Sequence, residues 1–127
     1  MPLTRISLRA GKPVEYRKAL TEGIQRALIE HCKVPPDDIF MLINEHDEGN
    51  FVFDRHYLGV ERSDDLVVVQ ITFNNTRTIE QKKAFYRQVV DNLAESPGVR
   101  REDVLINLVE VVKENWSFGN GVAHYAL

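Results

Sequence analysis

Val34-Pro35-Pro36-Asp37-Asp38-Ile39 and Val99-Arg100-Arg101-Glu102-Asp103-Val104 decide the fold, because the second stretch repeats the first after 65 residues. The same offset pairs Ile6 with Ile71 and Glu45 with Glu110. It also aligns two apolar stripes with the i, i+4, i+8 spacing of amphipathic helices. These stripes are Leu20-Ile24-Leu28 and Phe85-Val89-Leu93. The chain is therefore predicted to be built from a duplicated unit.

Each unit is predicted to run strand, helix, strand. Alternating residues over 3–9 indicate a half-exposed strand. Pro13, tolerated in a first helical turn, begins a helix that reaches about Cys32. The loop at 34–38 then leads back to a strand at Ile39–Ile43. The first unit thus spans about residues 2–45.

The second unit follows the same order over about residues 67–110. Leu66–Phe73 is almost continuously apolar, which is typical of a strand buried on both faces. Thr78 and Gln81 fit a capping box that begins a helix through about Glu95. Val104–Val112 is predicted as the fourth strand.

Strand-helix-strand units join parallel strands by right-handed crossovers. Two of them predict an α+β fold in which a four-stranded mixed sheet carries both helices on one face. Residues 1–127 form a single domain in this interpretation. The strand residues of the other face are too apolar to stay in water, so we expect an oligomer.

Two segments have no counterpart in the repeat. Residues 46–65 contain a turn signal at 48–50, with short extended pieces expected at 51–53 and 56–59. The C-terminal arm, about 113–127, holds Trp116, the only tryptophan, in the run Asn115-Trp116-Ser117-Phe118-Gly119. The arm is predicted either to pack on a neighbouring subunit or to form a pocket wall.

Composition excludes several classes of function. The net charge of −3 argues against a nucleic-acid-binding surface, which needs clustered Lys and Arg. No apolar run approaches the roughly 20 residues of a membrane span, and the N-terminus lacks the pattern of a secretory signal. With one cysteine, Cys32, a reduced cytoplasmic location is expected. The spacing of the four histidines favours no metal site, and no cofactor is implied.

Pro2 is the first candidate for chemistry. After removal of Met1 it would carry a free secondary amine, although a second-position proline commonly does no more than direct that removal. An apolar pocket or nearby cations would lower the pKa of this amine and make it a neutral base. Arg77, between a buried strand and a helix cap, is either a surface charge or a clamp for a carboxylate. Asp38 is either a loop residue or part of a site, and Trp116 and Phe118 either pack or contact substrate.

Together these residues resemble the tautomerase superfamily, and within it the malonate semialdehyde decarboxylase-like family. The resemblance rests on Pro2 at the start of a strand, the duplicated unit, Asp38, and the Trp116–Gly119 run. It implies a homotrimer whose pockets bind a small carboxylate substrate, with Pro2 as the catalytic amine, Asp38 as an acid that positions water, and Arg77 as an anion-binding residue. Trp116, Phe118 and Tyr125 would form an aromatic wall. This chain has Asn75 where the decarboxylase has a second arginine, and Asn75 is expected to bind substrate together with Arg77 and the aromatic wall.

Three hypotheses remain open at the level of sequence. The first is a tautomerase that isomerises the keto and enol forms of a small 2-keto or 3-keto acid. The second is a decarboxylase or hydratase of a small 3-oxo or unsaturated acid. The substitution at Asn75 favours the first, because two cations would better stabilise the enolate left by departing carbon dioxide. The third is a non-catalytic trimeric scaffold, which retention of Met1 would favour.

Overall fold

The computed structural model describes residues 1–127 and contains one four-stranded sheet in the order β2-β1-β3-β4. The strands are β1 (Leu3–Arg9), β2 (Met41–His46), β3 (Val67–Asn74) and β4 (Val104–Val111). β1 is parallel to β2 and β3 is parallel to β4, whereas β1 and β3 run antiparallel. The predicted mixed sheet is thus confirmed.

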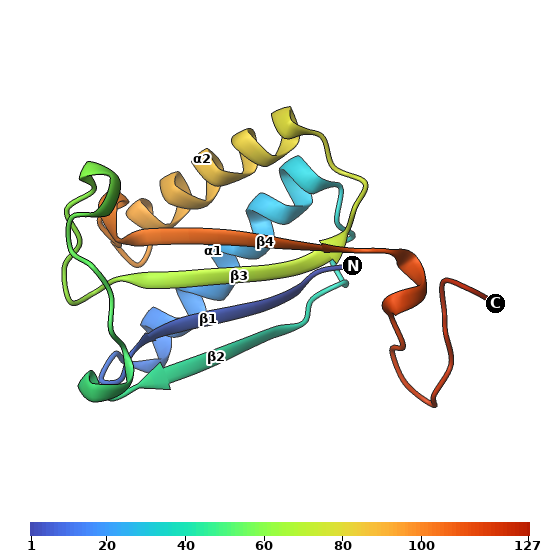
Figure 1. Ribbon diagram of the computed structural model, residues 1–127, viewed down its shortest axis with the longest axis horizontal. Helices are drawn as coiled ribbons and strands as arrows, with labels where there is room; N and C mark the ends of the chain where they lie inside the picture. The colour runs from blue at the N-terminus through green and yellow to red at the C-terminus, as the bar shows by residue number, and fades with distance from the viewer.

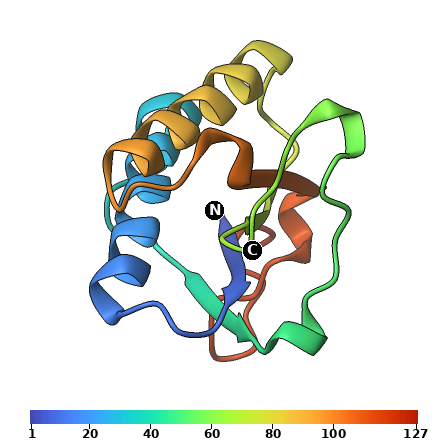
Figure 2. The same ribbon diagram turned by 90° about the vertical axis from the view of Figure 1, so that its left-hand side faces the viewer.

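The helices α1 (Val14–Cys32) and α2 (Ile79–Glu95) lie on the same face of the sheet, as predicted (Figures 1 and 2). α2 begins with the expected capping box, in which the Thr78 hydroxyl accepts from the Gln81 N–H and the Gln81 side chain accepts from the Thr78 N–H. α1 ends at Lys33, which takes a left-handed conformation with φ of 57°. The helices begin at positions that the 65-residue offset makes equivalent.

The core lies between the helices and the sheet. Gly23 of α1 permits a close crossing, because a Cβ there would lie 2.9 Å from Leu93 Cδ2 of α2. The largest fully buried side chains include Phe73 of β3 and Phe85 of α2. Burying an apolar side chain of this size stabilises the fold by roughly 1.5–3 kcal/mol. The core therefore fixes the ends of the strands, where the candidate site residues lie.

The opposite sheet face is open and of mixed character. Leu105 and Val109 of β4 are exposed on it, but so is Gln70, whose Nε2 donates to Asn107 Oδ1 at 3.0 Å. Within a single chain, β3 is therefore buried on one face only, and burial of its second face stays a prediction about the oligomer. Only alternate residues, from Val67 to Phe73, are buried against the helices.

Two local predictions also differ from the structure. The second strand begins at Met41 and continues to His46, because the loop after Asp38 stays irregular up to Phe40. The pieces expected to be extended at 51–53 and 56–59 form no strands, and a short 3-10 helix occupies Tyr57–Gly59. This segment is ordered by side chains instead, with His46, Phe51 and Phe53 packed in series.

The chain start and the C-terminal arm lie at the same end of the molecule (Figure 1). The Thr4 N–H donates to the Phe40 carbonyl at 3.0 Å, which anchors the start of β1 beside the loop that carries Asp38. Beyond a 3-10 turn at Lys113–Asn115, the arm has no helix or strand. No helix in the chain combines the length and apolar character needed to cross a membrane.

Candidate active site

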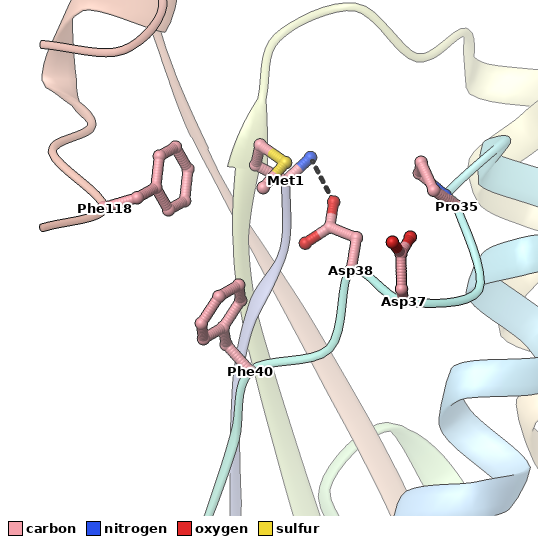
Figure 3. A pocket seen from close by; sticks show the side chains of 6 residues that line it. All are labelled: Met1, Pro35, Asp37, Asp38, Phe40 and Phe118. Carbon is pink, nitrogen blue, oxygen red and sulfur yellow. Dashed lines mark ion pairs between the residues drawn. The ribbon is translucent and has the colours of Figure 1, made fainter.

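Two cavities flank the first residues of the chain. One, of about 340 Å³, is lined by Met1, Pro35, Asp37, Asp38, Phe40 and Phe118 (Figure 3). The other, of about 200 Å³, is lined by Pro2, Leu3, Phe40, Trp116, Ser117 and Phe118. Phe40 and Phe118 border both cavities. The two cavities therefore form one aromatic-walled site around the start of the chain.

The terminal amine is held inside this site. With Met1 in place, its nitrogen lies 3.6 Å from Asp38 Oδ2, and Pro2 behind it is buried as an amide. Burial lowers the pKa of this amine below its usual 8.0, and the Arg77 charge lowers the pKa further, whereas Asp38 opposes both effects. An amine at this end of β1 is therefore biased toward its neutral form.

The Asp38 carboxylate is buried without a hydrogen-bond donor. Its residue is 7% exposed, and neither oxygen has a hydrogen-bond partner. The repeat supplies an internal comparison in Asp103, which is fully buried and accepts from the Ser63 N–H at 2.7 Å, from the Ser63 hydroxyl and from Arg100. Since buried carboxylates normally find such partners, Asp38 is the exception. One of its oxygens, Oδ2, faces the terminal amine (Figure 3).

Arg77 is anchored where β3 ends and α2 begins. Its Nη2 and Nε donate to the Cys32 carbonyl at 2.9 and 3.3 Å, and its guanidinium lies 5.0 Å from the centre of the Phe73 ring. Nη1 makes long contacts to the Asn74 carbonyl and the Thr76 hydroxyl, at 3.5 and 3.4 Å. Of the five N–H groups of an arginine, these bonds leave one on Nη2 free for a ligand.

The arm supplies the aromatic wall. The Trp116 and Phe118 rings stack at 5.4 Å with an interplanar angle of 7°, and Tyr125 meets Phe118 edge-on at 5.4 Å. Burial raises the pKa of the Tyr125 phenol, and the charges of Asp38 and Arg77 also act on it. The Trp116 indole nitrogen donates to Asn74 Oδ1 at 2.8 Å.

The structure thus gathers most of the predicted residues. Pro2, Asp38, Trp116 and Phe118 line the cavities. Arg77 and Tyr125 line neither cavity, but the Arg77 charge acts on the terminal amine and the Tyr125 ring packs against Phe118. Asn75 lies apart, since it is exposed and lines neither cavity.

The sequence does not predict a site role for Leu3, Pro35, Asp37 or Phe40, which line the cavities, nor for Asn74. The sequence pattern places Phe40 in a strand, whereas in the structure it is 50% exposed and borders both cavities. The one feature of the sequence that could have indicated a site role for Phe40 is that this aromatic residue lies two positions after Asp38. Asn74 gave no signal, because Asn74 and Asn75 are indistinguishable in sequence and only the fold buries one of them.

No group of three or more His, Cys, Asp or Glu side chains is arranged to hold a metal ion. The groups at this end of the sheet are an amine, a carboxylate, a guanidinium and an apolar wall. A neutral amine beside a buried carboxylate can move protons, and the nearby Arg77 cation can attract an anionic substrate.

Comparison with known proteins identifies the class. Two family models, each described as a tautomerase enzyme, match residues 38–119 and 2–61. The chain belongs to the tautomerase family.

Individual relatives match along the whole chain. Probable tautomerase YusQ of Bacillus subtilis (strain 168) is 42% identical over 97% of both chains. The structure of FG41 malonate semialdehyde decarboxylase inhibited by 3-bromopropiolate has a TM-score of 0.90 and 32% identity, over 97% of this chain and 93% of that one. A fused 4-OT wild type symmetric trimer shares the fold, with a TM-score of 0.78 at 19% identity over 98% of both chains.

Proposed function

We propose that this protein is a cofactor-independent tautomerase that interconverts the keto and enol forms of a small 2-keto or 3-keto carboxylic acid. The observation that carries the proposal is the buried Asp38 carboxylate, which has no hydrogen-bond donor and lies 3.6 Å from the Met1 amine within an aromatic-walled site. In the working enzyme Met1 is removed and the terminal amine is that of Pro2, the next residue, because with Met1 attached the Pro2 nitrogen is an amide and cannot accept a proton.

The steps follow from the groups present. The neutral Pro2 amine takes the proton of the enol hydroxyl, and the ammonium so formed returns a proton to the carbon, which completes the keto form. Asp38 stabilises the ammonium between the two transfers. Arg77 binds the substrate carboxylate through its charge and its remaining N–H, and Phe40, Trp116 and Phe118 exclude water from the site.

Decarboxylation or hydration of a small 3-oxo or unsaturated acid is the second candidate. The likeness to FG41 malonate semialdehyde decarboxylase favours it, and the unpartnered oxygens of Asp38 support a role in binding the attacking water. Arg77 counts against it, because most of its donors are engaged within the chain and Asn75 supplies no second cation. In this reaction Pro2 would act as a protonated acid.

The deciding experiment assays purified protein with phenylenolpyruvate and with malonate semialdehyde, after mass spectrometry has shown whether Met1 is removed. Ketonisation of the enol without release of carbon dioxide from the semialdehyde supports the tautomerase. Release of carbon dioxide as the faster reaction supports the second candidate. Processed protein that is inactive on both, or protein that retains Met1, supports a non-catalytic scaffold.

The pH dependence of kcat/KM follows from the electrostatics of the terminal amine. Burial and Arg77 lower the pKa of an amine at this end of β1. A neutral base works only above its pKa, so kcat/KM should rise with pH through a midpoint below that of a free prolyl amine. Removing the positive charge with Arg77→Gln should raise the amine pKa and move the midpoint to higher pH. If kcat/KM instead stays constant at low pH and falls only at alkaline pH, Pro2 acts as an acid and not as a base.

We propose that the working unit is a homotrimer in which the open sheet faces are buried. The exposed apolar residues Leu105 and Val109 on that face support subunit association. Sedimentation should give the mass of three chains, and Leu105→Glu should shift it toward one chain by placing a charge in the interface. Glu102→Gln, a change of an exposed residue just before β4, is the control and should leave the mass unchanged. A wild-type monomer would contradict the proposal.

A further inference from the structure

The arm, residues 113–127, is tied to the body by very few hydrogen bonds. At its root the Asn115 N–H donates to the Val112 carbonyl at 3.0 Å. The remaining backbone bonds of the arm, such as Val122 N–H to the Gly119 carbonyl, close turns within it. The only other hydrogen bond from the arm to the body runs from Trp116 Nε1 to Asn74 Oδ1, at 2.8 Å.

Asn74 is placed to hold the arm rigidly. It is the last residue of β3, its side chain is buried, and only 7% of the residue is exposed. The backbone carbonyl of the same residue accepts from Arg77 Nη1 at 3.5 Å. One residue of a rigid strand therefore contacts both the candidate anion-binding group and the arm.

A fixed Trp116 also fixes the rest of the wall. Its ring stacks on Phe118. The Phe118 ring in turn packs against the rings of Phe40 and Tyr125, with centroid distances of 6.1 and 5.4 Å. Stacking by itself allows the rings to slide in their plane, whereas a directional bond from the indole N–H sets the position of the ring. The wall over Pro2 is thereby located relative to β3.

We propose that Asn74 is a positioning residue, which holds the aromatic wall over Pro2 by accepting the hydrogen bond of the Trp116 indole. The proposal rests on the proposed function in one respect, namely that the wall borders a site where substrate binds. Asn74 itself does not line either cavity and is not assigned a contact with substrate.

The test begins with Asn74→Leu, which keeps the size of the side chain and removes the acceptor. Because Trp116 is the only tryptophan, its fluorescence reports on the arm alone. We expect a red-shifted emission and stronger quenching by acrylamide. The KM for phenylenolpyruvate should rise about tenfold, in line with the loss of one buried hydrogen bond, with a smaller change in kcat. Asn74→Asp retains an acceptor oxygen and should keep the emission close to that of the wild type.

Trp116→Phe removes the donor and keeps a ring for stacking. In this background Asn74→Leu should raise KM no further, because the bond it breaks is already absent. Where Asn74→Leu fails to fold, Asn74→Ala takes its place, since it also removes the acceptor and should give the same red shift and the same rise in KM.

Asn92→Leu is the matched control. Asn92 is equally buried, at 4% exposed, and its Nδ2 donates to the Gly23 carbonyl at 2.9 Å between the two helices. This variant should lower the Tm without altering Trp116 emission or KM. If Asn74→Leu behaves like Asn92→Leu, with a lower Tm and unchanged fluorescence and KM, Asn74 is structural only and the proposal is overturned. The fluorescence measurement tests the proposal even if the protein is not a tautomerase, because it does not depend on substrate.

Discussion

Replacing Pro2 with alanine should lower kcat/KM for phenylenolpyruvate by about 10²-fold or more, the range expected when a positioned acid–base group is lost. Alanine at this position leaves a primary amine, which differs from the prolyl amine in basicity and has no ring to fix its direction. Pro2 is buried just before β1, so no other amine can readily take its place in the site. The measurement is steady-state ketonisation at the pH optimum of each protein.

Two controls make this result specific. Mass spectrometry must show that Met1 is absent from both proteins, since a retained Met1 would block either amine. Pro36→Ala changes an exposed loop residue that lines neither cavity, and should leave kcat/KM close to that of the wild type. Unchanged activity in processed Pro2→Ala protein would remove Pro2 from the mechanism.

Much of the fold could be predicted because its determinants are local in sequence. The Thr78–Gln81 capping box set the start of α2, and the two apolar stripes identified the faces that the helices bury. The start of β2 could not be predicted correctly, because Ile39 and Phe40 are both apolar and resemble strand residues, whereas β2 begins at Met41. Its neighbours in the structure, Phe118 above all, come from the arm more than 70 positions away in the chain.

The site was predictable to the extent that its groups are chemically distinctive. Pro2 is marked by its position, and Asp38 by the resemblance to the tautomerase superfamily. Asn74 is marked by neither, because an amide at the end of a strand acquires meaning only when the arm brings Trp116 within 2.8 Å. Sequence also could not separate Asp38 from Asp103, since the repeat makes them equivalent and only the fold gives donors to one of them.

That difference gives the second prediction, in which Asp38→Asn and Asp103→Asn have opposite consequences. The Asp38 carboxylate is buried without a hydrogen bond, an arrangement that costs about 1–3 kcal/mol or more for a charged group. Asp38→Asn removes that charge, so the free energy of unfolding should stay the same or increase by about 1 kcal/mol. The same change should lower kcat/KM by about 10²-fold, because the ammonium formed during catalysis loses its counter-charge.

Asp103 is expected to behave in the reverse manner. Its carboxylate accepts from Ser63 and Arg100 and is fully buried. Asp103→Asn replaces an accepting oxygen with an NH₂ group, which leaves one of the Ser63 donors unpaired, so the free energy of unfolding should fall by about 1–3 kcal/mol. Denaturant titration of both variants measures this difference. The folded fraction of Asp103→Asn should retain most of the wild-type kcat/KM, since Asp103 lines neither cavity.

The pH profile of Asp38→Asn separates its catalytic role from a general disturbance of the site. Asp38 raises the pKa of the terminal amine, against the lowering by burial and Arg77. Loss of the carboxylate should therefore move the midpoint of the kcat/KM profile to lower pH, whereas Arg77→Gln should move it to higher pH. A disturbed fold has no reason to shift the midpoint in opposite directions for the two variants. Shifts in the same direction, or a loss of stability in Asp38→Asn as large as in Asp103→Asn, would mean that Asp38 serves the fold and not the amine.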